Sequence, residues 1–207
     1  MAREMRSIVK LSRREGYALH PKAHKVLVRR SGPPGQQSGR NFGMRSKSSQ
    51  YALQLREKQK VKRLYGLLEK QFANLMKEAS ASRGQSGAVL LEFLERRLDN
   101  AVYRAGFAPS RRAARQLVSH GHFMFNGRRV DVPSMRVKPL DVIEIKVGSK
   151  KTSYFTHLDE VSPVPSMIPA WLKVDRKKVS ATVTGLPTRE ESEPDIKEQL
   201  IVEYYSR

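Results

Sequence analysis

Three arginines of this 207-residue chain are spaced so that they can act together on a phosphate group. Arg115 follows Arg111 by four residues and Arg112 by three, and in a helix side chains at these separations project from the same side. Guanidinium groups bind phosphate through paired N–H donors. The spacing therefore predicts a cationic grip for the phosphates of a polyanion.

The residues around the arginines predict the helix that presents them. Ser110 follows a proline and is a natural N-cap, and Gly121 can take the positive φ that ends many helices. Apolar residues occupy the opposite side at helical spacing: Ala113, Ala114, Leu117 and Val118. We expect one short helix with an apolar face toward a core and the arginines outside.

Other residue patterns give no support to catalysis. The motifs His-Glu-x-x-His and Gly-x-Ser-x-Gly are absent. The stretch 148–152 resembles a phosphate loop only weakly, because the upstream glycine of such a loop falls at Ile143. His120 and His122 form a metal pair only if further ligands exist, and none lies nearby in the sequence, so contact with RNA or solvent is the better interpretation. We expect no enzyme activity, no metal and no cofactor.

Composition points to a polyanionic partner. Lys and Arg number 40 against 20 Asp and Glu, a formal net charge of +20, and self-repulsion on that scale opposes compaction unless an anion is bound. No cysteine is present, which excludes disulfides and thiolate metal sites. We find no secretory signal, no apolar run near the roughly 20 residues of a membrane span, and no lipid signal. We therefore expect a cytoplasmic location and no membrane partner.

The charge is unevenly distributed. Residues 1–65 hold 17 Lys and Arg and 3 Asp and Glu, a net charge of +14. Residues 96–130 hold 8 arginines and one aspartate, a net charge of +7. Residues 187–207 hold 3 basic and 6 acidic side chains, a net charge of −3. We expect the first two regions to contact the partner, and the acidic end to face protein or solvent.

The N-terminal half is predicted to contain a basic arm and a helical domain. Residues 1–48 are rich in Gly, Pro, Ser and cations, which favours an extended arm. This arm is either disordered in the isolated protein or ordered by the RNA against which it lies, and we favour the second interpretation. Residues 49–87 are predicted to be helical until a linker at 82–87, either as one helix or as two that meet near Gly66. Glu57 is the only acid at 50–65, so too few local ion pairs exist to explain the cations there.

The C-terminal half is predicted to contain a compact α+β module at residues 88–147. A helix over 88–105 and the helix after Ser110 would form an αα-hairpin. Asn126-Gly127 is a strong hairpin signal between two short strands, and alternation over 142–147 predicts a last strand. Residues 148–207 are expected to form a connection, with short strands near Trp171 and Ala181, and a C-terminal segment that packs back on the body. The predicted fold class is α+β: a helical N-terminal domain with an extended basic arm, and an αα-hairpin with a small antiparallel sheet.

Several motifs of the chain resemble the family of small-subunit ribosomal protein four. Those of its RNA-binding module lie at 97–100, 106–107, 115–120, 130–134 and 138–143, and flanking matches lie at 10–16, 54–61, 65–66, 171–175 and 200–203. The matches cover nearly the whole chain. The chain is similar to a cysteine-free bacterial type of this family, whose other members often carry cysteines near the N-terminus.

The resemblance implies a structural protein that binds small-subunit rRNA where helices of its 5′ domain meet and nucleates assembly of the subunit body. It also implies contact with ribosomal protein five of the same subunit, an effect on translational accuracy, and a place along the mRNA entry path. Arg111, Arg112, Arg115, Gln116 and His120 are carried over to the RNA face. Arg40, Arg45 and Lys47 are carried over to the mRNA path.

Charge adds further cations to the candidate RNA-binding set. These are Arg13, Arg14, Arg56, Lys58, Lys60, Lys62, Arg63, Arg96, Arg128 and Arg129. Two alternatives remain, a free RNA-binding regulator and an RNA-modifying enzyme that uses the same module for docking. We expect no homo-oligomer. Leu140 stands where the family usually has a glycine, and a leucine is less comfortable than a glycine in a turn with φ > 0.

Overall fold

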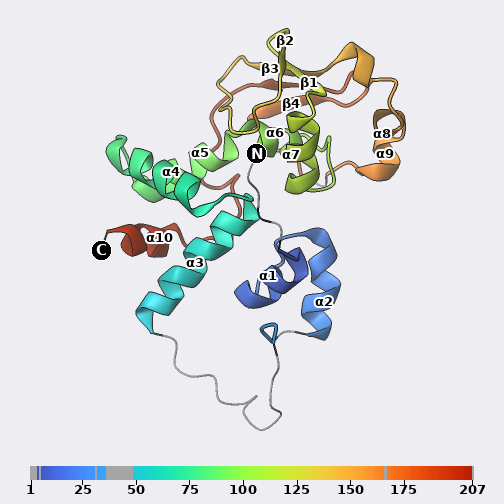
Figure 1. Ribbon diagram of the computed structural model, residues 1–207. Helices are drawn as coiled ribbons and strands as arrows, with labels where there is room; N and C mark the ends of the chain where they lie inside the picture. The colour runs from blue at the N-terminus through green and yellow to red at the C-terminus, as the bar shows by residue number, and fades with distance from the viewer. Residues whose placement is uncertain (1–3, 5, 31, 36–48, 166, 207) are drawn as a thin grey trace. The chain divides into compact units, whose positions relative to one another are not determined.

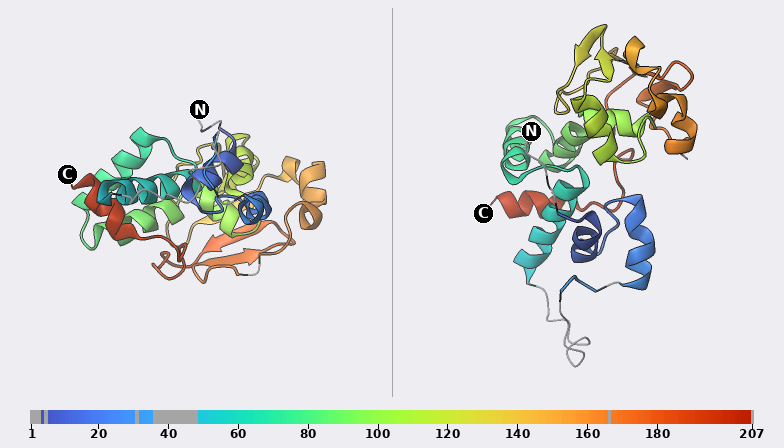
Figure 2. Two further views of the ribbon diagram at one scale, coloured as in Figure 1. Left: turned by 90° about the horizontal axis from the view of Figure 1, so that it is seen from below. Right: turned by 45° about the vertical axis from the view of Figure 1, so that its right-hand side comes forward.

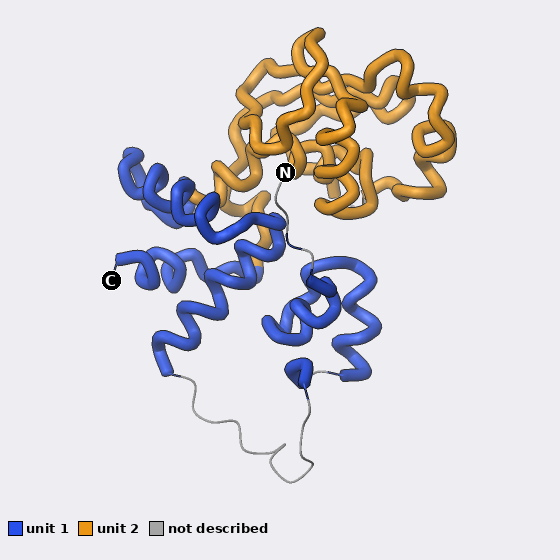
Figure 3. The backbone as a smooth tube through the Cα atoms, viewed as in Figure 1, with its two compact units in different colours: residues 1–89, 195–207 blue, residues 90–194 orange. Residues whose placement is uncertain are grey.

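The computed structural model describes residues 4, 6–30, 32–35, 49–165 and 167–206. The chain forms two compact units, which we call unit 1 (residues 1–89 and 195–207) and unit 2 (residues 90–194) (Figure 3). These limits differ from the four expected segments. Residues 148–194 belong with the module expected at 88–147, and the last residues return to unit 1.

Unit 1 is helical, and its helices are labelled in Figure 1. They are α1 (Ile8–Glu15), the 3₁₀ turn η1 (Pro21–Ala23), α2 (His24–Arg29), α3 (Gln50–Leu64), α4 (Glu69–Ala81), the first part of α5 (Ser86–Glu95), and α10 (Glu198–Tyr205). The linker expected at 82–87 is shorter than predicted, because α5 already begins at Ser86.

The prediction of an extended arm is wrong for residues 8–29, which form α1, η1 and α2. The two helices lie side by side (Figures 1 and 2), and Leu11, Leu19 and Ala23 are buried. Ser12 fixes the turn after α1, since its hydroxyl donates to the Ile8 carbonyl at 2.8 Å and accepts from the Leu19 N–H at 3.3 Å. The apolar residues of this region are too sparse to form a recognisable periodic stripe. The hydrophobic periodicity therefore did not predict these helices.

Residues 49–81, for which the sequence allowed one helix or two, form two helices, α3 and α4. Gly66 takes φ 66° between them, a conformation that a glycine adopts without cost. Val61 of α3 and Phe72 and Ala79 of α4 are fully buried. The C-terminal helix α10 lies beside α3 (Figure 2), where the Gln54 amide donates to the Glu203 carboxylate at 2.9 Å.

Unit 2 begins with a broken helix rather than the continuous one expected over 88–105. Helix α5 ends at Glu95, and α6 spans Leu98–Arg104. Arg97 between them is extended, with φ −65° and ψ 139°, and forms an antiparallel bridge with Arg136. The Val137 N–H donates to the Arg96 carbonyl and the Leu98 N–H to the Met135 carbonyl, both at 2.8 Å. Pairing with a distant strand-like segment thus replaces the local helical bonds.

A five-stranded antiparallel sheet completes unit 2, in the order β2-β1-β3-β5-β4. The strands are β1 (Phe123–Phe125), β2 (Arg128–Val130), β3 (Val142–Ile145), β4 (Leu172–Asp175) and β5 (Ser180–Val183). The two strands expected after residue 170 therefore extend the module's sheet. The strand at 142–147 is its central strand and not its last, which is why both of its edges are paired.

Helices α6 and α7 (Arg111–Ser119) contribute to one hydrophobic core with the sheet. The register pairs Phe123 with Ile145 and Ile143 with Ala181, so alternate residues of three strands share a buried face. Phe107 stacks on Phe123 with ring centroids 6.2 Å apart. Truncating a phenylalanine buried in this way typically costs about 3–5 kcal/mol. Trp171 also lies in this core.

The connections of unit 2 include the short helices η2 (Val147–Ser149), α8 (Ser153–Thr156) and α9 (Leu158–Val161). The turn before β3 does take the left-handed conformation, with Leu140 at φ 73°. The Leu140 N–H donates to the Val183 carbonyl at 2.8 Å, and the Asp141 carboxylate accepts from the Lys138 N–H at 2.6 Å and the Asn126 amide at 2.8 Å. These hydrogen bonds offset the roughly 1–2 kcal/mol that the left-handed conformation costs a residue with a side chain.

Candidate nucleic-acid interface

Helix α7 is positioned as the sequence predicts. The Ser110 hydroxyl accepts from the Ala113 N–H at 3.3 Å, and Gly121 has φ 70° just beyond the helix. Leu117 and Val118 are buried in the core of unit 2. The opposite face of α7 is therefore held at the surface, and its exposed side chains include Arg112, Gln116 and His120.

Two of the three arginines of the predicted grip lie against acids of the chain. Arg111 lies against the Glu193 carboxylate at 2.7 Å, and Arg115 lies 3.8 Å from the Asp99 carboxylate. Burial lowers the pKa of Arg115, against the opposing effect of Asp99. The acids that Arg111 and Arg115 face come from α6 and from the loop at 193. The spacing of residues within α7 therefore could not reveal these partners. Arg112 alone of the three is exposed.

The β1–β2 hairpin brings two further predicted cations to the surface. Asn126 and Gly127, at the predicted hairpin, have φ 49° and 76°, the two positive φ values that a type I′ turn requires. Arg128 and Arg129 follow it and are exposed. A Cβ atom placed on Gly121 would lie 2.7 Å from Nε of Arg129, so this guanidinium covers the C-terminal end of α7.

His120 and Lys146 lie near the same end of the helix. The His120 and His122 rings are 6.1 Å apart, and the Lys146 N–H donates to the His122 carbonyl at 2.9 Å. Burial lowers the pKa of His122, and His120 and Lys146 lower it further, so His122 favours the neutral form. Sequence reasoning missed Lys146, although its outward position after the alternating strand residues was a usable signal. We call Arg112, Gln116, His120, Arg128, Arg129 and Lys146 the α7 surface.

The cations of α3 behave differently from those of the α7 surface. Lys58 and Lys62 bind the two oxygens of Glu69 at 2.6 and 2.7 Å, and Lys60 binds Glu57 at 2.8 Å. Arg63 pairs with Glu15, and the side chains of these four cations are only 4–12% exposed. Local ion pairs are few in this run, as the sequence indicates, but acids of α1 and α4 supply structural partners that the sequence analysis did not expect.

Arg56 is the remaining cation of α3, and Glu15 is the acid that it shares with Arg63. Arg56 lies 3.3 Å from Glu15 but is 44% exposed, so it keeps a surface position. Burial raises the pKa of the Glu15 carboxyl, although Arg63 and Arg56 oppose that rise. Glu15 and Glu69 lie outside α3, on α1 and α4, so counting acids within 50–65 could not find them.

The remaining predicted residues are divided between exposed and bound positions. Arg13 donates to the Gly32 carbonyl at 3.0 Å, whereas Arg14 is exposed. Arg96 binds Glu92 at 2.8 Å and the Val137 carbonyl at 2.9 Å. The candidates for the mRNA path, Arg40, Arg45 and Lys47, lie outside the described residues.

Two structural searches of the described ranges bear on other kinds of site. No group of three or more His, Cys, Asp or Glu residues there could hold a metal ion. No helix in those ranges is long and apolar enough to cross a membrane. What the α7 surface can do chemically is to place guanidinium, ammonium and amide donors before an anion.

Comparison with known proteins identifies the family. Residues 3–95 match the family described as "Ribosomal protein S4/S9 N-terminal domain", and residues 96–143 match "S4 domain". The chain is 52% identical to the small ribosomal subunit protein uS4 of Pelodictyon phaeoclathratiforme, 51% identical to that of Chlorobium phaeovibrioides and 48% identical to that of Herpetosiphon aurantiacus, in each case over the full length of both chains. The chain therefore belongs to the uS4 family of small ribosomal subunit proteins.

Proposed function

We propose that the protein binds small-subunit rRNA through the α7 surface of unit 2. Membership of the uS4 family makes it a structural constituent of the small ribosomal subunit in the cytoplasm, and not an enzyme. The observation that carries the proposal is the separation of cations on α7. Within the described ranges no carboxylate forms an ion pair with Arg112, Arg128 or Arg129, whereas Arg111 pairs with an acid of the chain.

Affinity should come from phosphate contacts with release of counterions, and selectivity from the shape of the RNA. The major groove of an A-form helix is too narrow for side chains to read. Unit 1 offers a second set of exposed cations on its first two helices, Lys10, Arg14, Lys25 and Arg29. We assign them to rRNA as well.

The proposal extends to what the resemblance implies for this family. It includes binding at a junction of helices in the rRNA 5′ domain, nucleation of the subunit body and contact with ribosomal protein five. It also includes an effect on translational accuracy and a place along the mRNA entry path. The last assignment rests on the resemblance alone, since Arg40, Arg45 and Lys47 lie outside the described residues.

A salt series tests the α7 surface directly. The full chain and its Arg112→Ala plus Arg129→Ala variant are titrated with a transcript of the rRNA 5′ domain at increasing KCl. We expect roughly tenfold weaker binding and a salt slope shallower by about 1.5, because each lost phosphate contact removes roughly 0.7–0.9 from the slope. Melting temperature checks that the fold is unchanged.

The matched control removes the same charge elsewhere in unit 2. Lys173→Ala plus Lys177→Ala changes two exposed cations at β4 and the turn after it. This control should keep most of the wild-type slope. An unchanged slope in the arginine variant, or an equal loss in both variants, contradicts the assignment.

A further inference from the structure

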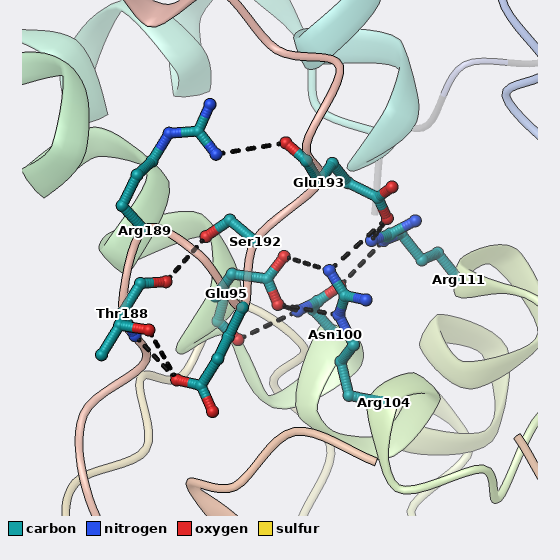
Figure 4. A network of polar contacts seen from close by, with 9 residues as sticks. Glu95, Asn100, Arg104, Arg111, Thr188, Arg189, Ser192 and Glu193 are labelled. Carbon is teal, nitrogen blue, oxygen red and sulfur yellow. Dashed lines mark hydrogen bonds and ion pairs between the residues drawn. The ribbon is translucent and has the colours of Figure 1, made fainter. Parts of the chain in front are cut away.

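Two arginines of unit 2 converge on one carboxylate that comes from a distant part of the chain. Arg111, at the start of α7, approaches the Glu193 oxygen Oε1 with Nη2 at 2.7 Å. Arg104, at the end of α6, approaches the same oxygen with its Nη2 at 3.4 Å. Figure 4 shows both guanidinium groups directed toward this carboxylate. One anionic oxygen thus lies between two guanidinium donors from different helices.

Both guanidinium groups are held by other partners besides Glu193. The Glu95 carboxylate accepts two bonds from Arg104, at 3.0 and 2.8 Å, and the Asn100 side-chain oxygen accepts from Arg111 Nε at 2.8 Å. Glu95 and Asn100 are themselves buried and joined by a hydrogen bond of 2.7 Å. The two arginines would therefore keep their directions if Glu193 left, and such a preorganised pair pays little to bind a new anion.

The segment that carries Glu193 is anchored by its other residues. Glu191 accepts from the Thr188 N–H and hydroxyl at 3.0 Å and from the Ala170 N–H at 2.8 Å. Ser192 is buried. Glu193 itself lies outside any helix or strand, and its side chain is 19% exposed. Rotation of the Glu193 side chain can therefore move its carboxylate away from the arginines while the anchored segment stays in place.

Charge balance favours exchange with an anion from solution. Arg104, Arg111, Glu95 and Glu193 carry two positive and two negative charges in contact with one another. A phosphate that replaces the Glu193 carboxylate keeps the arginines compensated, and the released carboxylate regains its hydration in water. Arg111 is adjacent in sequence to Arg112, so this position continues the α7 surface.

We propose that Arg104 and Arg111 form a phosphate-binding site for RNA that the protein occupies with its own Glu193 carboxylate until RNA displaces it. The proposal rests on the proposed function, since the displacing anion is a backbone phosphate of the bound RNA. Glu193 then acts as an internal competitor that weakens binding of RNA at this end of α7.

The experiment compares two charge-matched variants of the full chain in the same KCl series. Glu193→Gln removes the competing carboxylate, while Glu190→Gln removes an exposed carboxylate of the same loop. We expect Glu193→Gln to bind the 5′-domain transcript about threefold to tenfold more tightly, with a salt slope steeper by about 0.8 for one added phosphate contact. Glu190→Gln should differ little from the wild type. Equal behaviour of the two variants overturns the proposal.

Two further variants protect the test from a folding defect and from failure of the proposed function. Glu193→Asp keeps the charge but draws the carboxylate back by one methylene, and it should give a smaller gain in affinity. In an Arg111→Gln background the gain from Glu193→Gln should vanish, and a gain that persists overturns the assignment to Arg111. If Arg112→Ala plus Arg129→Ala flattens the slope while the Glu193 variants match the wild type, the α7 surface stands and the occupied site is wrong.

Discussion

Helices α3 and α7 are both basic in sequence, but most cations of α3 pair with acids of the chain, whereas α7 and the hairpin beside it leave several cations exposed. On α3, Lys58 and Lys62 are turned toward a glutamate of α4. On α7, Arg112 is exposed, and Arg128 and Arg129 of the neighbouring hairpin are exposed with it. A run of positive charge therefore does not identify a ligand surface by itself. What decides the role of each cation is whether another part of the fold supplies it with a carboxylate.

The comparison also assigns different physical roles to the two groups. Partly buried pairs that are hydrogen-bonded contribute to the stability of unit 1, while exposed cations contribute little to stability and remain available to an external anion. Substitutions in α3 should thus change unfolding, and substitutions on the α7 surface should change RNA binding. Three predictions test this division, in order of decreasing size.

The largest effect is expected at Lys58 of α3. Its ammonium donates to Glu69 at 2.6 Å and lies 4.6 Å from the centre of the Tyr204 ring. Lys58→Ala removes a charge-assisted hydrogen bond, a cation–π contact and a buried stem, and should lower the free energy of unfolding by about 3 kcal/mol. Urea unfolding of the full chain measures this loss.

Two variants separate the causes of that loss. Lys58→Met keeps the apolar stem and should recover part of the stability, while Lys77→Ala, an exposed lysine of α4, should change it by less than about 0.5 kcal/mol. If Lys58→Ala were as stable as Lys77→Ala, the distinction between the two helices would fail.

A middle-sized effect is expected from the pH dependence of Glu69. Burial alone raises its pKa, but hydrogen bonds from Lys58, Lys62 and Tyr205 outweigh burial and lower the pKa from 4.5 to about 2. Because the pKa in the folded state is the lower one, this carboxylate stabilises the fold above pH 4.5 and loses that effect as the pH falls from 4.5 toward 2. The side chain is 49% exposed, so screening reduces the contribution to about 1–2 kcal/mol.

The measurement is the difference in unfolding free energy between the wild type and Glu69→Gln at several pH values. The difference should be largest at pH 6 and should shrink between pH 4.5 and 2. Asp195→Asn, a change at an exposed acid of the same unit, serves as the control for the loss of one negative charge. A difference that is constant with pH would contradict the pairing of Glu69 with the α3 lysines.

The smallest effects are expected from a crossed pair of single substitutions. Arg112→Ala should reduce the salt slope of rRNA binding by about 0.7–0.9 and leave the unfolding free energy within about 0.5 kcal/mol of the wild type. Lys62→Ala should lower stability by about 1 kcal/mol and leave the salt slope unchanged, because its ammonium already binds Glu69. Titration in KCl and urea unfolding of both variants complete the test, and reversed outcomes would exchange the roles of α3 and α7.

Features decided by neighbours in sequence could be predicted. The cap at Ser110, the end of α7 at Gly121 and the turn at Asn126-Gly127 depend on the conformations and donors of a few adjacent residues, and all three are confirmed. The antiparallel α+β class followed from the same local signals and is also confirmed.

Features decided by distant residues could not be predicted. The break between α5 and α6 arises because Arg97 pairs with Arg136, and Arg63 is neutralised by Glu15, which lies 48 residues away. The partner of Arg111 is Glu193, 82 residues away. The acidic excess at 187–207 was the one signal in the sequence for this ion pair. It predicted that these acids face protein or solvent, but it did not identify Arg111 as the arginine that Glu193 contacts.

The discontinuous course of unit 1 has a consequence for the order in which a newly made chain can fold. Residues 90–194 are contiguous, so they can become compact as soon as they have been synthesised. The packing of the first 89 residues is completed only when residues 195–207 are present, because Tyr204 of α10 contacts Lys58 and Tyr205 of α10 contacts Phe72. The helices that are synthesised first are thus the last to gain all their packing contacts. A nascent polypeptide released before α10 would contain all residues of unit 2, but unit 1 would lack α10.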